Sequence, residues 1–228
     1  MKITAEQTEQ LYQFTRQHYV EYYDLQTELV DHLANGIENQ WRKNPKLTFE
    51  EALQQEFKKF GVFGFMTVVE ERQQAMYKRY NRIVWIHFKA FFTLPKIAIT
   101  VLSVLLLKLV LKRILFADEL VLTLFIGLLL FFFIGLIIAK RKSNRKLKMS
   151  GKKWMLEEVI YTFGSMAGFT YLPLQIFLRI WEHSEHPVMI WVISIIIVIM
   201  AVLEYVLLVA IPKKSEVYLG QTYPEKYI

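Results

Sequence analysis

The chain has 228 residues, of which 54% are hydrophobic, and its formal net charge at pH 7 is +7. So high an apolar content is unusual for a soluble domain and favours a membrane protein. No cysteine occurs, which excludes disulfides, thiolate metal sites and a cysteine nucleophile. Residues 1–80 carry ten Lys/Arg against twelve Asp/Glu, whereas residues 81–228 carry eighteen against nine. We therefore expect an acidic, polar region followed by a basic, apolar one.

The acidic region, residues 1–80, is predicted to form a small cytoplasmic domain of three helices. The break KNPK at 43–46 is typical of a turn. Thr48 and Glu51 have the spacing of a capping box, which predicts the start of the second helix. A third helix leads through a connector at 81–95 toward the apolar region. The first helix is expected to run from about Thr4 to Gln40.

The stretch EYYDLQTELVDHLANGIE, residues 21–38, has two periodic faces. Apolar residues such as Leu25, Leu29 and Leu33 recur at three- and four-residue steps, which predicts a buried stripe. Acidic residues recur at the same steps on a neighbouring face, and no Lys or Arg occurs from Gln17 to Trp41. The candidate residues of this second face are Glu21, Asp24, Glu28, Asp31 and His32.

This acidic face has several interpretations. A carboxylate-bridged metal site would need Glu-x-x-His motifs from facing helices, but His32 follows Glu28 by four residues and neither other helix of the domain offers a histidine. We therefore expect no metal, no cofactor and no catalytic residue here, and His32 is interpreted as a helix-surface partner of Glu28. The face is either simply solvated or a docking surface. Its receptor would be a second protein or the basic segment 140–153 of the same chain.

These residues resemble a known family. DLQTELVDHLANGIE, then TFEEALQQEFKKFG, then a helix into membrane spans resembles the N-terminal domain of bacterial HAAS-type signalling proteins. It is also similar to a group of uncharacterised Bacteroidetes membrane proteins. The resemblance covers residues 1 to about 75 and implies a cytoplasmic helical module attached to membrane helices, with no catalytic residue. The segment FGVFGFM departs from the polar turn of those domains, so the third helix is free to pack differently.

Four apolar stretches are predicted to cross the membrane. A hydrocarbon core of about 30 Å needs about 20 apolar residues in a helix. Lys108 interrupts the first stretch, and Glu204 is the single charge in the fourth. A four-helix transmembrane bundle is therefore expected at 96–211, followed by a cytoplasmic tail at 212–228. The four expected spans are residues 96–113, 120–139, 159–178 and 188–211.

The connections between the spans predict their direction. Residues 140–153, read as a loop, hold eight Lys/Arg and no acid, whereas the connections at 116–119 and 182–187 are short and acidic. Excess Lys/Arg marks the cytoplasmic side, so both termini are expected in the cytoplasm of a bacterium, with the spans in its inner membrane. We interpret 140–153 as a topology determinant that rests against anionic lipid headgroups. Nucleic-acid binding is disfavoured, because no recognised fold accompanies the basic segment.

Two features within the spans are candidates for function. An acid at the depth of Glu204 is costly and is a functional candidate by default, with Lys108 as its partner if the first and fourth spans touch. The alternative is a protonated or hydrogen-bonded Glu204 without a transport role. In the third span, Gly164 and Gly168 permit close helix approach, either within the bundle or in a homodimer.

Three functions remain open on this basis. The first is a non-enzymatic membrane protein with a cytoplasmic docking or sensor domain, which binds a protein partner through residues 21–38 in a regulatory or signalling role. The second is a small transporter or transporter subunit that uses Glu204 and Lys108. The third, a membrane-embedded enzyme, rests only on the histidine pair of EHSEH at 182–186 and is disfavoured.

Overall fold

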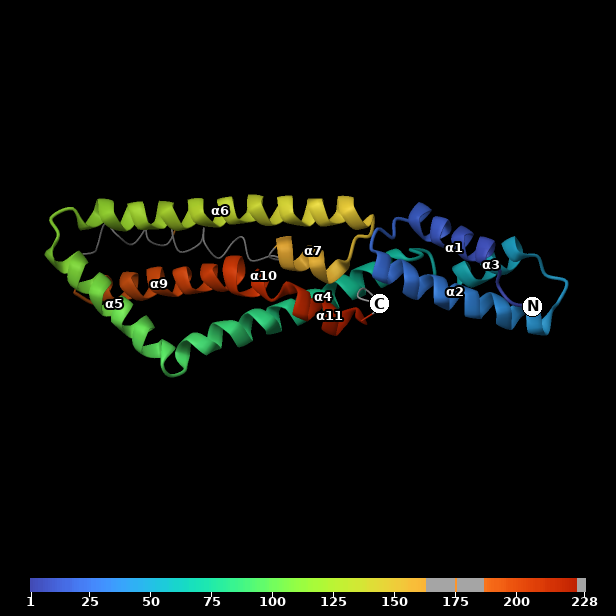
Figure 1. The fold of residues 1–228 in the computed structure, drawn as a ribbon, viewed down its shortest axis with the longest axis horizontal. Coiled ribbons are helices and arrows are strands. Elements are labelled where there is room, and N and C mark those ends of the chain that lie inside the picture. The colour runs from blue at the N-terminus through green and yellow to red at the C-terminus, as the bar shows by residue number, and fades with distance from the viewer. Residues whose placement is uncertain (163–174, 176–186, 225–228) are drawn as a thin grey trace. The chain divides into compact units, whose positions relative to one another are not determined.

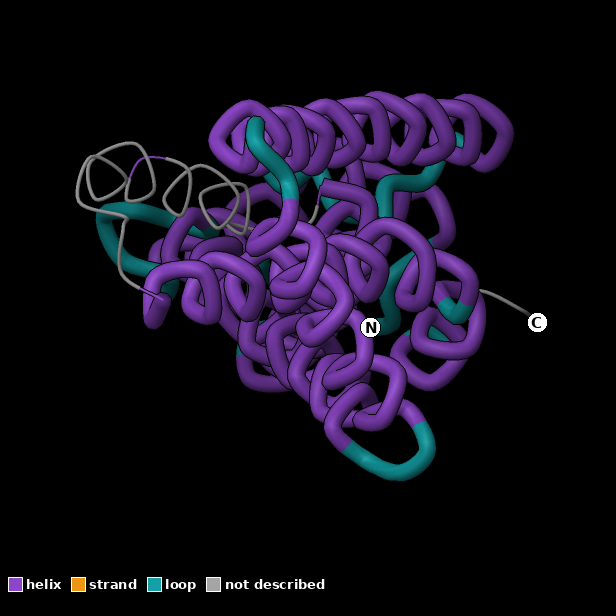
Figure 2. The backbone as a smooth tube through the Cα atoms, turned by 90° about the vertical axis from the view of Figure 1, so that its left-hand side faces the viewer, coloured by secondary structure: helices purple, strands orange, loops and turns teal. Residues whose placement is uncertain are grey.

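The computed structural model describes residues 1–162, 175 and 187–224. This described part consists of helices and loops without a strand, which confirms the all-α class (Figure 2). It forms two units: residues 1–78 with 147–158, and residues 79–146 with 159–228. The helices labelled in Figure 1 are α1 (Ala5–Gln17), α2 (Tyr23–Lys43), α3 (Phe49–Lys58), α4 (Met66–Lys89), α5 (Lys96–Arg113), α6 (Ala117–Ser150), α7 (Met155–Thr162), α9 (Pro187–Tyr205), α10 (Ile211–Lys213) and α11 (Ser215–Thr222).

The prediction of a single first helix over residues 4–40 is wrong, because the helix is interrupted between α1 and α2. Tyr19 has φ 64°, a left-handed conformation that non-glycine residues seldom adopt. The break buries Val20, and the side chain of Gln26 donates a hydrogen bond to the Val20 carbonyl. The region before the connector therefore holds α1, α2, α3 and the first part of α4.

Local signals account for the packing of the first unit. Leu25, Leu29 and Leu33 are all buried, as the periodicity predicts. Thr48 caps α3 by accepting a hydrogen bond from the Glu51 amide, while the Glu51 side chain accepts one from the Thr48 amide. This confirms the predicted capping box.

The prediction of a loop at 140–153 is wrong for most of the segment, because α6 continues to Ser150. Lys, Arg, Leu and Met are good helix formers, and no glycine or proline occurs in the segment before Gly151. Gly151 has φ +64°, and its amide donates to the Leu147 carbonyl, which is how a glycine ends a helix. At about 1.5 Å per residue, α6 is about 50 Å long and exceeds the hydrocarbon core.

In the second unit, α6 and the stretch Val188–Lys213 are each long and apolar enough to cross a membrane. A third span is possible if Met66–Phe92 and Lys96–Arg113, bent by 75° at their break, count as one. The expected spans 120–139 and 188–211 lie in the two clear candidates. Figure 1 shows α6 and α9 running alongside each other. A buried cluster joins them to α5: Leu111, Val121, Phe125, Ile193, Ile197 and Met200.

The remaining expectations on the membrane region have mixed outcomes. The expected span 96–113 coincides with α5, but it qualifies only as part of the bent pair. The expected span 159–178, with Gly164 and Gly168, lies almost entirely outside the described residues. The expected tail at 212–228 is helical up to Thr222 and contributes buried Leu219 to the second unit.

Candidate functional site

The start of α2 lies against the turn that follows α6, and both segments belong to the first unit. The Tyr23 amide donates a hydrogen bond to the Lys153 carbonyl at 2.7 Å. The Met155 amide donates to Asp24 Oδ1 at 3.2 Å. Because Met155 opens α7, the Asp24 carboxylate stands at a helix N-terminus, where a negative charge is favoured.

Asp24 is therefore buried, which corrects the expectation that it lies on an open acidic face. A buried carboxylate is costly unless hydrogen bonds and opposite charge or dipole compensate it. The α7 amide supplies part of that compensation. Replacing Asp24 would thus disturb the fold as well as any docking surface.

Lys153 is the charged centre of this contact. Its Nζ lies 2.8 Å from Glu21 Oε2 and 2.9 Å from Glu158 Oε2. Burial disfavours the charged ammonium, but the hydrogen bonds to Glu21 and Glu158 outweigh it and raise the pKa of Lys153 above its ordinary value. The lysine therefore stays charged at any physiological pH and holds α2 and α7 to the same turn.

Aromatic rings complete the contact. The Tyr23 ring lies 5.4 Å from that of Trp154, centroid to centroid, at an interplanar angle of 66°. Lys152 Nζ lies 4.0 Å from the centroid of the Tyr23 ring, a cation–π geometry. A hydrogen bond from Lys152 lowers the pKa of the Tyr23 hydroxyl. Burial and the nearby Glu158 charge raise the pKa of Tyr22.

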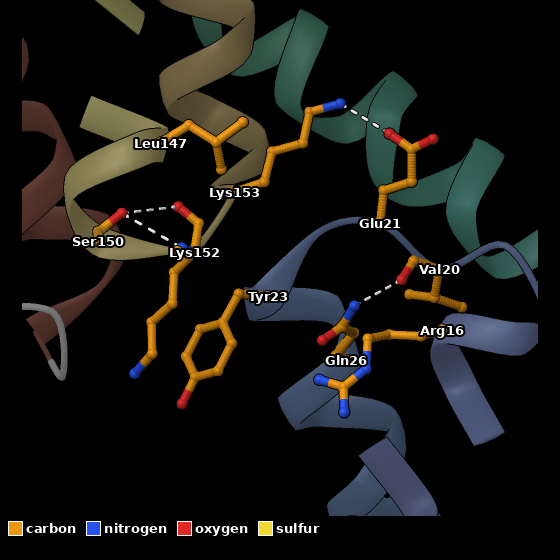
Figure 3. A pocket seen from close by; sticks show the side chains of 10 residues that line it. Arg16, Val20, Glu21, Tyr23, Gln26, Leu147, Ser150, Lys152 and Lys153 are labelled. Atoms are coloured by element: carbon orange, nitrogen blue, oxygen red, sulfur yellow. Dashed lines mark hydrogen bonds and ion pairs between the residues drawn. The ribbon is translucent and has the colours of Figure 1, made fainter. Parts of the chain in front are cut away.

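A cleft of about 590 Å³ opens beside the contact. Figure 3 shows Lys153 extended toward Glu21, while Lys152 lies along the Tyr23 ring. The cleft offers polar and cationic surface, which suits the binding of a polar group. Its lining residues are Arg16, Val20, Glu21, Tyr23, Gln26, Leu147, Ser150, Gly151, Lys152 and Lys153.

The other candidate residues of α2 have separate surroundings. Glu28 Oε2 pairs with Arg72 of α4 at 2.8 Å, so the expected pairing of Glu28 with His32 is not formed. His32 is exposed, and its ring lies 5.6 Å from the ring of Phe60. Asp31 is exposed to solvent. The acidic face thus divides into an engaged beginning, Glu21 to Glu28, and an open part at Asp31 and His32.

Glu204 and Lys108 are not brought together. Lys108 Nζ lies 3.9 Å from the centroid of the Trp191 ring, and Trp191 precedes Glu204 by 13 residues on α9, or about 20 Å. Glu204 is 1% exposed, and neither carboxylate oxygen has a hydrogen-bond partner among the described residues. Its helix continues into a π-helical segment at Val206–Ala210. Within the same described part, no three His, Asp or Glu side chains are grouped to hold a metal ion.

The sequence offers segment 140–153 as one of the alternative receptors for the acidic face, but it does not indicate which residues contact α2. Gly151 signals the end of a helix, and the residues that make the contact follow it directly. The packing of Tyr23 on Lys152 and Trp154 has no local signal. No protein-family model, curated protein or solved structure matches the chain. The function is therefore argued from the site itself.

Proposed function

We propose that the chain is a non-enzymatic, multi-pass protein of the bacterial inner membrane with a regulatory helical domain on the cytoplasmic side. The observation that carries the proposal is the contact between the start of α2 and residues 152–155. That turn directly follows α6, one of the two clear candidates for a membrane span. A helical domain that holds this turn is coupled to a membrane helix through a few polar contacts.

The energetics of the contact suit regulation. The Glu21 carboxylate that pairs with Lys153 is 70% exposed, so its ion pair contributes on the order of 0.5 kcal/mol. The Tyr23 and Met155 hydrogen bonds and the Tyr23–Trp154 ring contact add to this. A ligand or protein opens the contact when its preference for the open form exceeds that total. The proposed switch is thus between a state in which the start of α2 contacts residues 152–155 and a state in which this contact is broken.

The proposed partner is a protein that binds the open part of α2, at Asp31 and His32. Asp31 and His32 are among the motif residues through which the N-terminal region resembles HAAS-type modules. In the proposed topology four spans cross the membrane and both termini are cytoplasmic, as the basic segment 140–153 favours. That segment also contacts anionic lipid headgroups in this proposal.

The test is crosslinking and mass spectrometry of the tagged full-length protein in native membranes, compared with Asp31→Lys and with a variant lacking residues 1–80. Asp31 is exposed and off the buried stripe, so its reversal is expected to reduce partner capture without unfolding the domain. Asn35→Lys, another exposed α2 position, is the matched control for an added lysine. Identical partners for all four proteins would contradict the docking role.

The second candidate function is transport, favoured by one observation: Glu204 is buried beside a π-helical segment. π-Helical turns occur often at functional sites, and an acid inside a membrane helix is a candidate for ion or proton handling. Glu204→Gln keeps the side-chain volume and discriminates between the two functions. Loss of cellular function with normal insertion would favour transport, whereas unchanged function would favour the regulatory role.

A further inference from the structure

The turn between α3 and α4 presents large apolar side chains to solvent. Val62 is 99% exposed, Phe63 is 73% exposed and Met66 is 53% exposed. Single exposed apolar residues are common on soluble surfaces, but three together at the tip of one turn mark an interaction site. The turn therefore needs a partner that accepts apolar groups.

The backbone of the turn fixes this presentation. Gly61 and Gly64 have φ +77° and +54°, conformations that favour glycine. A Cβ on Gly64 would lie 2.9 Å from Phe57 Cζ, so the turn also packs too closely for a larger residue. These two glycines direct Val62 and Phe63 outward.

A cluster of aromatic rings supports the turn from below. Phe65 is buried, and its ring centroid lies 4.9 Å from that of Phe57 and 4.8 Å from that of Phe60. Phe14 and His18, at the end of α1, pack on the same cluster. The turn with Val62 and Phe63 thus packs on the aromatic cluster, so these side chains are exposed in the folded unit.

Charge around the turn indicates what the partner is. No acidic residue occurs from Phe57 to Val69, whereas Lys58 and Lys59 stand exposed just before the turn. Lys59 pairs with the buried Glu56 at 2.6 Å, so Lys58 is the lysine considered for a headgroup. An apolar tip flanked by lysines matches the bilayer interface, where apolar groups enter the acyl boundary and ammonium groups meet lipid phosphates.

A short stretch of chain joins the aromatic cluster below the turn to the contact at Lys153. His18 caps the end of α1, and its ring packs on the aromatic cluster. A few residues later, the Tyr23 amide donates a hydrogen bond to the Lys153 carbonyl. Gly151 directly follows α6, and Lys153 lies two residues after Gly151. The turn and the contact with residues 152–155 thus belong to the same unit.

We propose that the turn at residues 61–66 inserts Val62, Phe63 and Met66 into the interface of an anionic lipid bilayer, as a second anchor of the N-terminal unit. Lys58 contacts the headgroups. This anchor is independent of the contact at Lys153, so either proposal stands if the other fails.

The absence of cysteine permits a direct test on the full chain. Phe63→Cys, labelled with an environment-sensitive fluorophore, is reconstituted in nanodiscs of mixed phosphatidylcholine and phosphatidylglycerol. The control is Gln54→Cys, an exposed position on α3. Insertion predicts a blue-shifted emission for position 63 and at least threefold stronger quenching by brominated acyl chains than for position 54. Adding Lys58→Glu should weaken that quenching, since it reverses a headgroup contact.

Equal, weak bromolipid quenching at both positions would overturn the proposal. A blue shift at position 63 that persists without bromolipid quenching would also overturn it, because the tip would then be covered by protein. Dependence of that shift on protein concentration would identify a second copy of the chain as the cover. Circular dichroism of each labelled protein checks that the unit is folded.

Discussion

Removing the Lys153 ammonium tests the contact between α2 and the turn after α6. Its side chain is 28% exposed and pairs with Glu21, which is 70% exposed, and with Glu158, which is 31% exposed. The Glu21 pair contributes about 0.5 kcal/mol. The cation–π contact of Lys153 Nζ with the Tyr22 ring, 4.8 Å from its centroid, contributes about 1 kcal/mol. The Glu158 pair lies within the turn and α7 and is kept when the contact with α2 opens. Lys153→Met keeps the apolar stem of the side chain and should therefore lose about 1.5 kcal/mol from the closed state, or about tenfold in the opening equilibrium.

Hydrogen–deuterium exchange of the full chain in nanodiscs measures this change. The amides of Tyr23 and Met155 are both hydrogen-bonded across the contact, so they exchange only when it opens. Peptides that contain them should exchange about tenfold faster in Lys153→Met. Peptides from α3 should be unchanged, because they lie in the same unit but not at the contact.

Lys148→Met is the matched control, since it removes the same charge from an exposed position on α6. It should leave exchange at Tyr23 and Met155 within about twofold of the parent protein. Equal exchange rates for Lys153→Met and the parent would refute the reasoning, because the Lys153 ammonium would then contribute nothing to holding α2 against the turn.

Three further predictions concern the first unit. Gly36→Ala should destabilise it by about 1–3 kcal/mol, because the new Cβ would lie 2.5 Å from Glu56 Cδ; thermal unfolding measures this. Burial raises the pKa of Glu56, but hydrogen bonds from Lys59 and Gln40 outweigh it and leave the pKa below its ordinary value of 4.5. The stability from this carboxylate is therefore present above pH 4.5 and lost as the pH falls further, and denaturant titrations of Glu56→Gln should show a weaker acid dependence than the parent. Asp24→Ala should cost about 1 kcal/mol and speed exchange at Met155, with Asp24→Asn in between; unchanged exchange in the alanine variant would exclude a capping role.

Sequence predicted the features that local periodicity and composition determine. The buried stripe of α2 follows from apolar residues at three- and four-residue steps, and the start of α3 follows from Thr48 and Glu51. The apolar runs at 120–139 and 188–211 lie in helices long enough to cross a membrane. These signals are contained in a few consecutive residues, so they need no knowledge of the rest of the fold.

The features that escaped prediction depend on distant residues. The break between α1 and α2 falls at Tyr19, where neither glycine nor proline announces it. Asp24 looks like a surface acid until α7, more than a hundred residues later, supplies the amide it binds. Likewise Glu28 pairs with Arg72 across helices, and its neighbours on α2 do not reveal that partner. The candidate site is a tertiary contact, and sequence alone identified only its two segments.

The contacts of the charged residues also depend on distant parts of the chain. The position of segment 140–153 between two apolar runs predicts a loop, yet its lysines and arginines extend a helix well when no breaker intervenes. Lys108 and Glu204 belong to two helices that pack together, but Lys108 contacts Trp191, which is about 20 Å from Glu204 along α9. Composition identifies unusual residues, and packing decides which of them meet.

Zero-length carbodiimide crosslinking of the unmodified protein in native inverted membranes tests the central contact most directly. This reagent joins a carboxylate to an amine only when the two already form an ion pair. The account predicts an isopeptide bond between Glu21 and Lys153, whose charged atoms lie 2.8 Å apart. The ion pair of Lys146 with Glu216, within the second unit, is the positive control. Formation of the control bond without any Glu21–Lys153 bond would contradict the account, because the N-terminal unit would then not hold the turn after α6.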